Sequence, residues 1–266
     1  MFQTLKNALK IKDIRRKLVY TFLALIVVRL GSQLIIPGVN ADKLTSFFKE
    51  FSSLNFFDAF TGGGFSQMSI FTLSITPYIT SSIIIQLLTI AIPKLEEMQK
   101  DGEDGRRKLS EATRYVAVVL AMVESLAMAI GFSQKDVIDG DWKTIVLIVL
   151  SMTAGSTYLM WLGERITEKG VGNGISIILL INIVSRVPSD MMALYTQFIR
   201  DKENRFEQLI AILVIAAIIL FVVVFVVILS DGERRIPVQY AKKTQGRKQV
   251  GGQSTYIPLK VNTAGV

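Results

Sequence analysis

The chain has 266 residues and a net charge of +8, half of its residues are hydrophobic, and its mean hydropathy is +0.44. A soluble domain rarely has this composition, so the sequence predicts a membrane protein. It contains no cysteine and no histidine, which excludes disulfides, thiolate or imidazole metal ligands and any nucleophile–histidine triad. Because no constellation of carboxylates, lysines, serines or tyrosines replaces them, we expect neither an enzyme nor a cofactor.

Apolar runs recur along the chain, and about 20 apolar residues are enough to span the hydrocarbon core of a bilayer. We predict six spans: Leu18–Ile36, Ile70–Ile92, Tyr115–Phe132, Ile145–Leu162, a short one at Ile175–Val187, and Leu209–Leu229. The last contains no polar side chain, whereas Asn182 and Ser185 interrupt the fifth. The predicted fold is an all-α, polytopic bundle of about six transmembrane helices.

The distribution of Lys and Arg predicts the orientation of the bundle. Most basic residues lie in segments 1–17, 93–114, 163–172 and 231–260, which share one side of the membrane if the spans alternate. We therefore expect a multi-pass protein of the cytoplasmic membrane with a cytoplasmic N-terminus. The first 17 residues are basic, as in amphipathic surface helices. They do not form a secretory signal, because the following apolar run is too long and lacks a cleavage site.

The segment from Phe56 to Ile92 differs from an ordinary anchor helix. It begins with a half-polar stretch broken by glycines, and its apolar part contains hydroxyls, an amide and Pro77. Non-helical backbone at membrane depth is tolerated only where protein or a water-filled cavity surrounds it. The segment therefore predicts such a cavity. Ile75 and Ile79 share one helix face because they are four residues apart, although lipid-facing aliphatics give the same pattern.

Glu124 lies near the middle of the third predicted span. An ionisable side chain there is costly unless it faces protein or water, which favours a functional site. The alternative is structural, with the carboxyl group hydrogen-bonded to a neighbouring helix. A proton relay would need acidic partners, and the other five predicted spans contain none.

A glycine-rich turn, Gly170 to Gly174, follows the fourth predicted span. Asn173 is placed to cap the next helix. A phosphate-binding loop is disfavoured, because the segment lacks the Gly-Lys-Ser/Thr ending and a preceding strand.

Five segments together carry a specific resemblance to a known family. They are ITPYITSSIIIQLL, GEDGRRKLSEATRY, MWLGERITEKGVGNGISIIL, GERRIPVQYAKK and GGQSTYIPLKVNTAGV. In order and spacing they resemble SecY, the family of pore-forming subunits of the bacterial protein translocase. SecY consists of two inverted repeats of five helices. The resemblance implies that residues 1–190 hold the first repeat with a plug-like half-helix. Residues 191–266 would then hold an external loop, the sixth helix and a basic cytoplasmic loop of a truncated form.

The resemblance also implies a pore ring of aliphatic side chains at the narrowest point of the channel. Its members in this sequence would be Ile75, Ile79, Ile175 and Leu179. Such a ring blocks ions by dewetting when the channel is idle. The remaining members in the family belong to the seventh and tenth helices, which this sequence does not include.

Two further elements follow from the resemblance. The plug would extend from Asn55 to Gln67 and include Phe57, Asp58, Phe60, Gly62, Gly63 and Gly64. The three glycines would give its backbone the freedom to swing aside, although an ordinary external loop has the same composition. The lateral gate, through which signal sequences reach lipid, would include Thr80, Gln86 and Glu124.

The basic cytoplasmic loop is the expected contact with the ribosome and the SecA motor. Its residues are Arg234, Arg235, Lys242, Lys243, Arg247 and Lys248. Basic side chains can bind RNA phosphates, although the orientation rule alone also places them here. The other expected partners are SecE, SecG, signal peptides, unfolded preproteins and membrane lipid.

The resulting hypothesis is a protein-conducting channel subunit that passes preproteins across the membrane or releases helices into it. A secondary transporter built from inverted repeats is the alternative. A non-transporting chain that only binds partner helices is a third interpretation.

Overall fold

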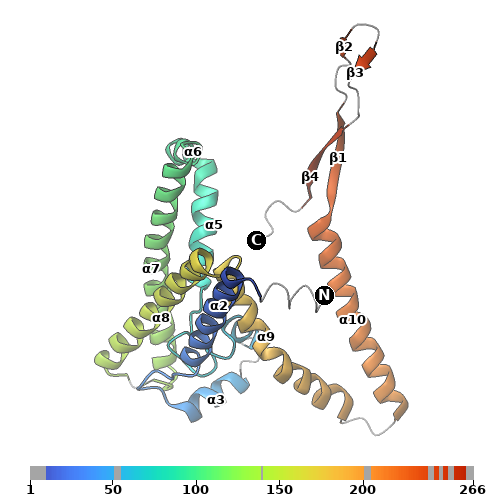
Figure 1. Ribbon diagram of the computed structural model, residues 1–266. Coiled ribbons are helices and arrows are strands. Elements are labelled where there is room, and N and C mark those ends of the chain that lie inside the picture. The colour runs from blue at the N-terminus through green and yellow to red at the C-terminus, as the bar shows by residue number, and fades with distance from the viewer. Residues whose placement is uncertain are drawn as a thin grey trace. The chain divides into compact units, whose positions relative to one another are not determined.

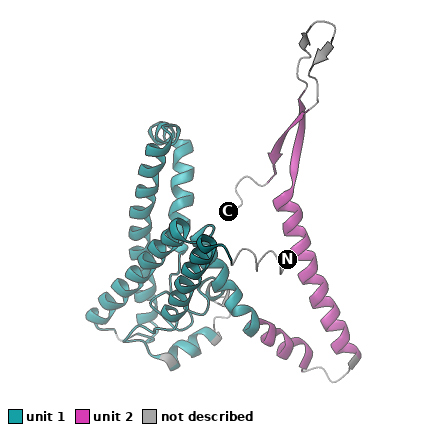
Figure 2. Cartoon of the chain, in the orientation of Figure 1, with its two compact units in different colours: residues 1–189 teal, residues 190–266 magenta. Residues whose placement is uncertain are grey.

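The computed structural model describes residues 10–50, 55–138, 140–200, 205–238, 243–245, 248–250 and 255–261. The chain divides into two compact units, residues 1–189 and 190–266 (Figure 2). Nearly all regular structure of the first unit is helical, whereas the second unit combines helix with β-hairpins (Figure 1).

The first unit consists of helices joined by short turns and by one longer turn segment, residues 62–75. Its helices are α2 (Lys12–Gly31), α3 (Ala41–Glu50), α4 (Asn55–Thr61), α5 (Thr76–Ala91), α6 (Pro93–Lys100), α7 (Glu103–Ser133), α8 (Trp142–Lys169) and α9 (Gly174–Tyr195). The last of these continues into the second unit.

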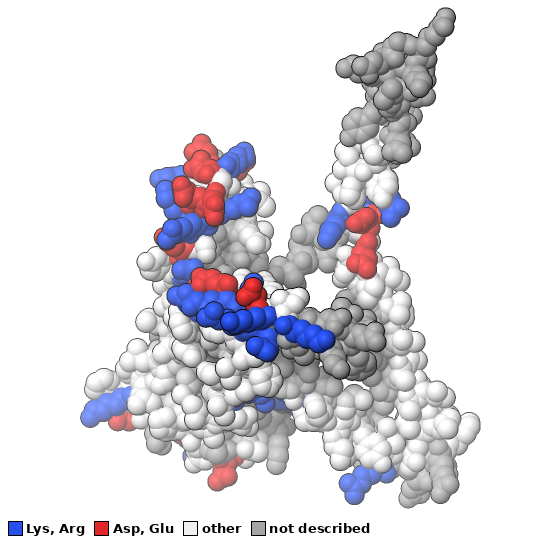
Figure 3. Space-filling model, in the orientation of Figure 1, with Lys and Arg blue, Asp and Glu red and all other residues white. Residues whose placement is uncertain are grey.

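The helices α5 and α7 lie side by side and are joined through α6 (Figure 1). The axis of α6 is bent by 104° from that of α5. Pro93 explains the bend, because a proline disfavours the helical conformation of the preceding residue. Ile92 is accordingly extended, with φ −111° and ψ 111°. Figure 3 shows charged side chains gathered over the α6 end of this hairpin, and uncharged ones along its flanks.

A single stripe of α7 is buried, and most of its side chains are small. Its members recur at every fourth position: Gly105, Leu109, Thr113, Ala117, Ala121, Ser125 and Ala129. Small residues let neighbouring membrane helices approach closely. The Ser81 hydroxyl of α5 donates to the Thr113 carbonyl at 3.1 Å. On the other side, the hydroxyls of Ser125 and Thr153 lie 3.1 Å apart and join α7 to α8.

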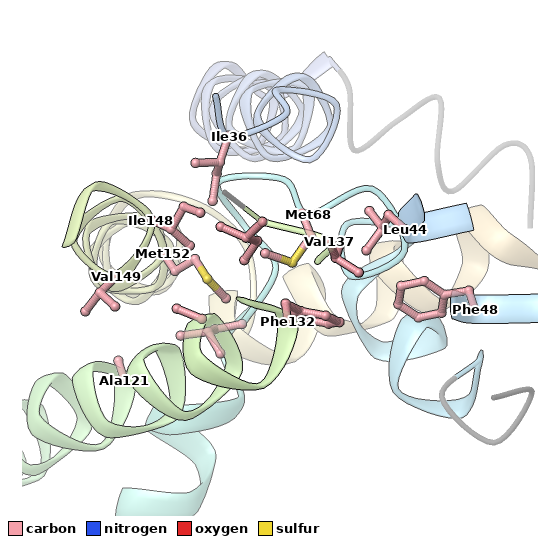
Figure 4. Close-up of a cluster of buried hydrophobic side chains, with 13 residues drawn as sticks. Ile36, Leu44, Phe48, Met68, Ala121, Phe132, Val137, Ile148, Val149 and Met152 are labelled. Carbon is pink, nitrogen blue, oxygen red and sulfur yellow. The ribbon is translucent and has the colours of Figure 1, made fainter. Parts of the chain in front are cut away.

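Two clusters of buried apolar side chains form the core of the first unit. One joins α7 and α8 to α3 and to the turns before α5, and Met68, Phe132 and Met152 lie within it (Figure 4). The other joins α2, α8 and α9, and Val28, Leu159 and Ile178 belong to it.

Among the described residues, four helical stretches are long and apolar enough to cross a membrane: Glu103–Ser133, Trp142–Lys169, Gly174–Arg200 and Phe206–Asp231. The bent α5–α6 pair would be a fifth. Within the described residues these helices agree with the predicted all-α, polytopic bundle. The predicted first span differs, because α2 carries several charges in its first turns and ends at Gly31. The predicted second span also starts later, because residues 62–75 form turns and α5 begins at Thr76.

The second unit contains a short π-helical turn and one long helix, followed by paired strands. These are η2 (Thr196–Arg200), α10 (Arg205–Asp231), β1 (Glu233–Val238), β2 (Lys243–Gln245), β3 (Lys248–Val250) and β4 (Thr255–Lys260). The strands pair antiparallel, β1 with β4 and β2 with β3. These strands differ from the prediction of a basic cytoplasmic loop in this region.

The contact between α8 and the turn segment 62–75 requires a glycine. A Cβ atom built at Gly155 would lie 2.0 Å from the backbone oxygen of Ile70. We expect Gly155→Ala to lower the free energy of unfolding by about 1–3 kcal/mol, because the backbone must move to relieve the clash. Thermal unfolding in detergent, followed by circular dichroism, measures the effect.

The matched control is Gly131→Ala in α7, where a Cβ atom meets nothing within 4 Å. Helix propensity alone should make this variant more stable, by up to about 1 kcal/mol. Equal melting temperatures for the two variants would contradict the proposed packing of α8.

Candidate functional site

A cavity of about 690 Å³ lies among α4, α5, α7 and α9 in the first unit. Its lining is mainly apolar and includes Phe60, Phe65, Ile79, Met128 and Leu179. Glu124 is the one charged side chain among the described residues that line it. The site is therefore an apolar cavity that is walled by membrane helices and contains a single carboxyl group.

The start of α5 places Ile79 at the cavity. Pro77 occupies the first turn, where the missing N–H costs nothing because it would have no helical partner. Ile75 precedes the helix, and its carbonyl accepts the N–H of Ile79 at 3.1 Å, so the two residues lie one turn apart. Ile79 is half-buried and lines the cavity, whereas Ile75 is 0% exposed and belongs to the core cluster of α2, α8 and α9.

The start of α9 places Leu179 at the same cavity. The Asn173 side-chain oxygen accepts the N–H groups of Ile175 and Ser176 at 3.1 and 3.4 Å, which confirms the predicted cap. Ile175 packs close to Gly163 of α8, where a Cβ atom would lie 3.0 Å from its side chain. Of the four predicted ring residues, the cavity thus brings together Ile79 and Leu179, while Ile75 and Ile175 pack beside it.

The plug segment, residues 55–67, comprises α4 and the turns that follow. The Asp58 side chain is 1% exposed and forms an ion pair with Arg186 of α9. Phe60 reaches the cavity, and the side chain of Phe57 lies outside the described part of the chain. Gly62 and Gly63 have φ values of +66° and +92°, so they are needed for the turn that ends α4. Gly64 completes the turn without a positive φ.

Two further polar side chains, to which the sequence analysis assigned no role, contact this segment. Arg29 of α2 donates to the Gly62 carbonyl and to the Ser185 hydroxyl, both at 3.0 Å. Asn182 of α9 donates to the Phe60 carbonyl at 3.4 Å. A polar side chain inside a predicted span is a signal that the sequence shows, but its partners lie far away along the chain and become visible only in the fold.

The three predicted gate residues do not meet at one point. Glu124 lines the cavity, Thr80 is half-buried on α5, and Gln86 is exposed further along α5. Within the described ranges, no group of three or more acidic side chains is placed to hold a metal ion.

The predicted partner loop lies in the second unit. Arg234 and Arg235 are exposed on β1, and the Arg235 guanidinium lies 4.7 Å from the centre of the Tyr256 ring on β4. Lys243 lies in β2 and Lys248 in β3, whereas Lys242 and Arg247 fall outside the described residues. The described basic residues of this region, Arg234, Arg235, Lys243 and Lys248, therefore lie in antiparallel strands.

Comparison with known proteins assigns the family. The SecY family model matches residues 69–266. The protein translocase subunit SecY of Halalkalibacterium halodurans is 45% identical over 271 residues, which cover 100% of this chain. The corresponding subunit of Bacillus subtilis is 43% identical over 272 residues, again with 100% of this chain covered. The chain belongs to the SecY family.

The match covers 63% of each of these two SecY proteins, so the chain spans somewhat less than two thirds of their length. Family membership makes the chain a membrane protein related to translocase subunits rather than to classical enzymes. It also confirms the resemblance inferred from the five sequence segments.

Two solved structures share the fold of this SecY family member. One is described as a protein-conducting channel and has a TM-score of 0.51, with 93% of this chain and 53% of that chain covered. The other concerns the SecY plug domain and has a TM-score of 0.54, with 93% and 52% covered. Both are 19% identical to this chain, so they support the architecture alone.

A thiol reporter tests whether water fills the cavity. The natural sequence has no cysteine, so Leu179→Cys introduces a single reactive thiol. We expect a membrane-impermeant maleimide to label it in lipid vesicles, because the reactive thiolate forms in water and not in hydrocarbon. Mass spectrometry of the labelled protein gives the rate.

Leu180→Cys is the matched control, since Leu180 lies at the same depth, is 59% exposed and does not line the cavity. It should react at least about tenfold more slowly, because thiolate formation in hydrocarbon is strongly disfavoured. Equal labelling rates at the two positions would argue against a hydrated cavity.

Proposed function

We propose that this chain provides a channel wall of the Sec translocon, the machine that passes unfolded preproteins across the cytoplasmic membrane. The observation that carries the proposal is the apolar cavity, which Ile79 and Leu179 line from two different helices and the plug segment borders. Membership in the SecY family supports the same function.

The lining suits an unfolded polypeptide of any sequence. Aliphatic side chains such as Ile79 and Leu179 offer no strong hydrogen bond or charge to which a passing chain would adhere. In the idle channel, a narrow aliphatic constriction dewets and excludes ions. In this mechanism the pore ring seals loosely around a moving polypeptide, and the channel hydrolyses nothing itself.

The plug segment would close the cavity on the external side. Phe60 and Phe65 place aromatic side chains at the cavity, where they fill space that a translocating chain would need. Transport then requires the segment to move, and signal-sequence entry beside Thr80, Gln86 and Glu124 would part the helices. This lateral opening would also release hydrophobic helices into lipid.

We further propose a cytoplasmic N-terminus and the partners of the family. The positive-inside distribution of Lys and Arg supports this orientation. The exposed Arg234 and Arg235 favour an RNA or acidic protein surface, which fits the ribosome and SecA. SecE and SecG would cover apolar helix faces that are exposed in the single chain. Residues 1–190 and 191–266 would serve as the first repeat and its extension, and the two compact units support this division.

A secondary transporter would use the cavity differently. It would need a substrate or ion site near Glu124, with charged partners at the same depth. Glu124 is the single charged side chain among the described lining residues, so the geometry favours a polypeptide channel.

Site-specific photocross-linking tests the proposed function. A photoreactive phenylalanine analogue replaces Leu179 in the chain expressed in its own cells, during export of a preprotein that is stalled by a folded C-terminal domain. We expect a covalent adduct with the preprotein, because the translocating chain would touch the cavity lining. The same analogue at Leu180 should give little adduct, and equal yields at both positions would refute the assignment.

Ion conductance tests the aliphatic constriction. We expect Ile79→Gly combined with Leu179→Gly to raise ion leak several-fold in planar bilayers that contain the chain with its membrane partners, because a wider constriction stays wet. Ile83→Gly with Leu180→Gly is the control, since each glycine carries the same helix-propensity cost of about 1 kcal/mol outside the cavity. A similar leak in both double variants would contradict the ring.

A further inference from the structure

The plug segment is attached to the helix bundle by a buried ion pair. The Asp58 carboxylate accepts hydrogen bonds from the Arg186 guanidinium, from the Ser66 N–H at 2.8 Å and from the Thr61 hydroxyl at 3.3 Å. Asp58 is 1% exposed, and the Arg186 side chain is 23% exposed. The ion pair therefore joins the plug segment to α9 at a point from which water is largely excluded.

Two further side chains bind the end of α4. The last carbonyls of a helix have no partner within it and carry partial negative charge. Arg29 donates to the Gly62 carbonyl at 3.0 Å, and Asn182 donates to the Phe60 carbonyl at 3.4 Å. The Arg29 guanidinium also binds Ser185 at 3.0 Å, so α2 and α9 hold the plug segment together.

Burial makes these contacts cooperative. Removing one member of a buried ion pair leaves the other charge without compensation, which is far costlier than removing both. Movement of the plug segment into an aqueous funnel would instead hydrate both charges. The ion pair thus stabilises the closed position of the plug segment, and in an open position water can solvate the two separated charges.

We propose that Asp58 and Arg186, assisted by Arg29 and Asn182, form an ionic clasp that sets how readily the plug segment leaves its closed position. This inference rests on the proposed channel function and deepens it, because it assigns plug-positioning roles to residues of α2 and α9. The closed state is then maintained by charge pairing as well as by the apolar packing of Phe60 and Phe65. The aliphatic ring and the clasp are separate seals.

The reactivity of a thiol on the plug segment measures how often the segment leaves its closed position. Ala59 neighbours Asp58 and is half-buried, so Ala59→Cys places the single cysteine of the chain on α4. Because Ala59 is only half-buried, a water-soluble maleimide labels it slowly in the closed position and faster when the segment opens, so an increase in rate reports a larger open population. In lipid vesicles we expect Asp58→Asn and Arg186→Gln each to accelerate labelling by about tenfold or more. Asp58→Asn retains an oxygen that can accept the Ser66 N–H, so this variant tests the loss of the negative charge without the loss of that hydrogen bond.

Two variants separate the ion pair from general loosening. Arg186→Lys keeps the positive charge and should label at nearly the parental rate. Asp58→Asn combined with Arg186→Gln removes both charges and should label no faster than the faster single variant, because coupled partners are non-additive. Labelling rates that multiply in the double variant, or parental rates in both single variants, would overturn the proposal.

A surface ion pair provides the matched control. Arg165 and Glu168 of α8 are joined at 2.7 Å and are exposed. Arg165→Gln should leave Ala59→Cys labelling unchanged, and acceleration there would count against the clasp. Helix content by circular dichroism and labelling of Leu180→Cys must match the parent in every variant, and a clasp variant that changes either of them counts against the proposal.

The thiol-labelling experiment tests the clasp, and the photocross-linking experiment tests the channel function, so the two can fail separately. If preproteins form adducts at Leu179 but the clasp variants label at the parental rate, the clasp is refuted and the channel function is retained. Accelerated labelling without adducts would retain the clasp as a closure of the cavity and remove the translocation function.

Discussion

The architecture of the first unit depends on a non-helical backbone segment buried inside a membrane bundle. Residues 62–75 run through turns, and their N–H and C=O groups need partners where water is scarce. The segment supplies many of them itself, and others come from the chain after α2. The Ile36 N–H donates to the Met68 carbonyl at 3.1 Å, and the Ile70 N–H donates to the Leu34 carbonyl at 2.9 Å. Gly155 lets α8 approach the Ile70 carbonyl closely enough to cover this backbone.

The cavity follows from this buried segment. Because residues up to Ile75 are used in turns, α5 begins only at Thr76, and Thr76 and Ile79 of its first turn line the space beside α4. The start of α9 is fixed independently by the Asn173 cap. Two helix starts that are set by local chemistry thus place Ile79 and Leu179 at one apolar cavity.

Local signals in the sequence predict some of these features and leave others open. Length and uniform apolarity were sufficient for α10, and side-chain chemistry was sufficient for the Asn173 cap. The periodicity that placed Ile75 and Ile79 on one face could not show that Ile75 precedes the helix and packs into the core, because this depends on α2, α8 and α9. The hairpin of β1 and β4 pairs residues that lie far apart in the sequence, and charge alone suggested only a loop there.

The role of a polar residue inside a predicted span cannot be inferred from that residue alone, because it depends on which side chains the fold places beside it. Glu124 and Arg186 are both costly at membrane depth; in the sequence analysis Glu124 stayed open between function and structural support, and Arg186 was not singled out. The fold separates them. Glu124 faces the cavity, whereas Arg186 compensates the buried Asp58 across 128 positions of sequence. Asp58 in turn lies on α4, a helix of only 7 residues. Under the proposed clasp, the Arg186 charge on α9 stabilises the closed position of the plug segment and also governs its release, because the same contact serves both.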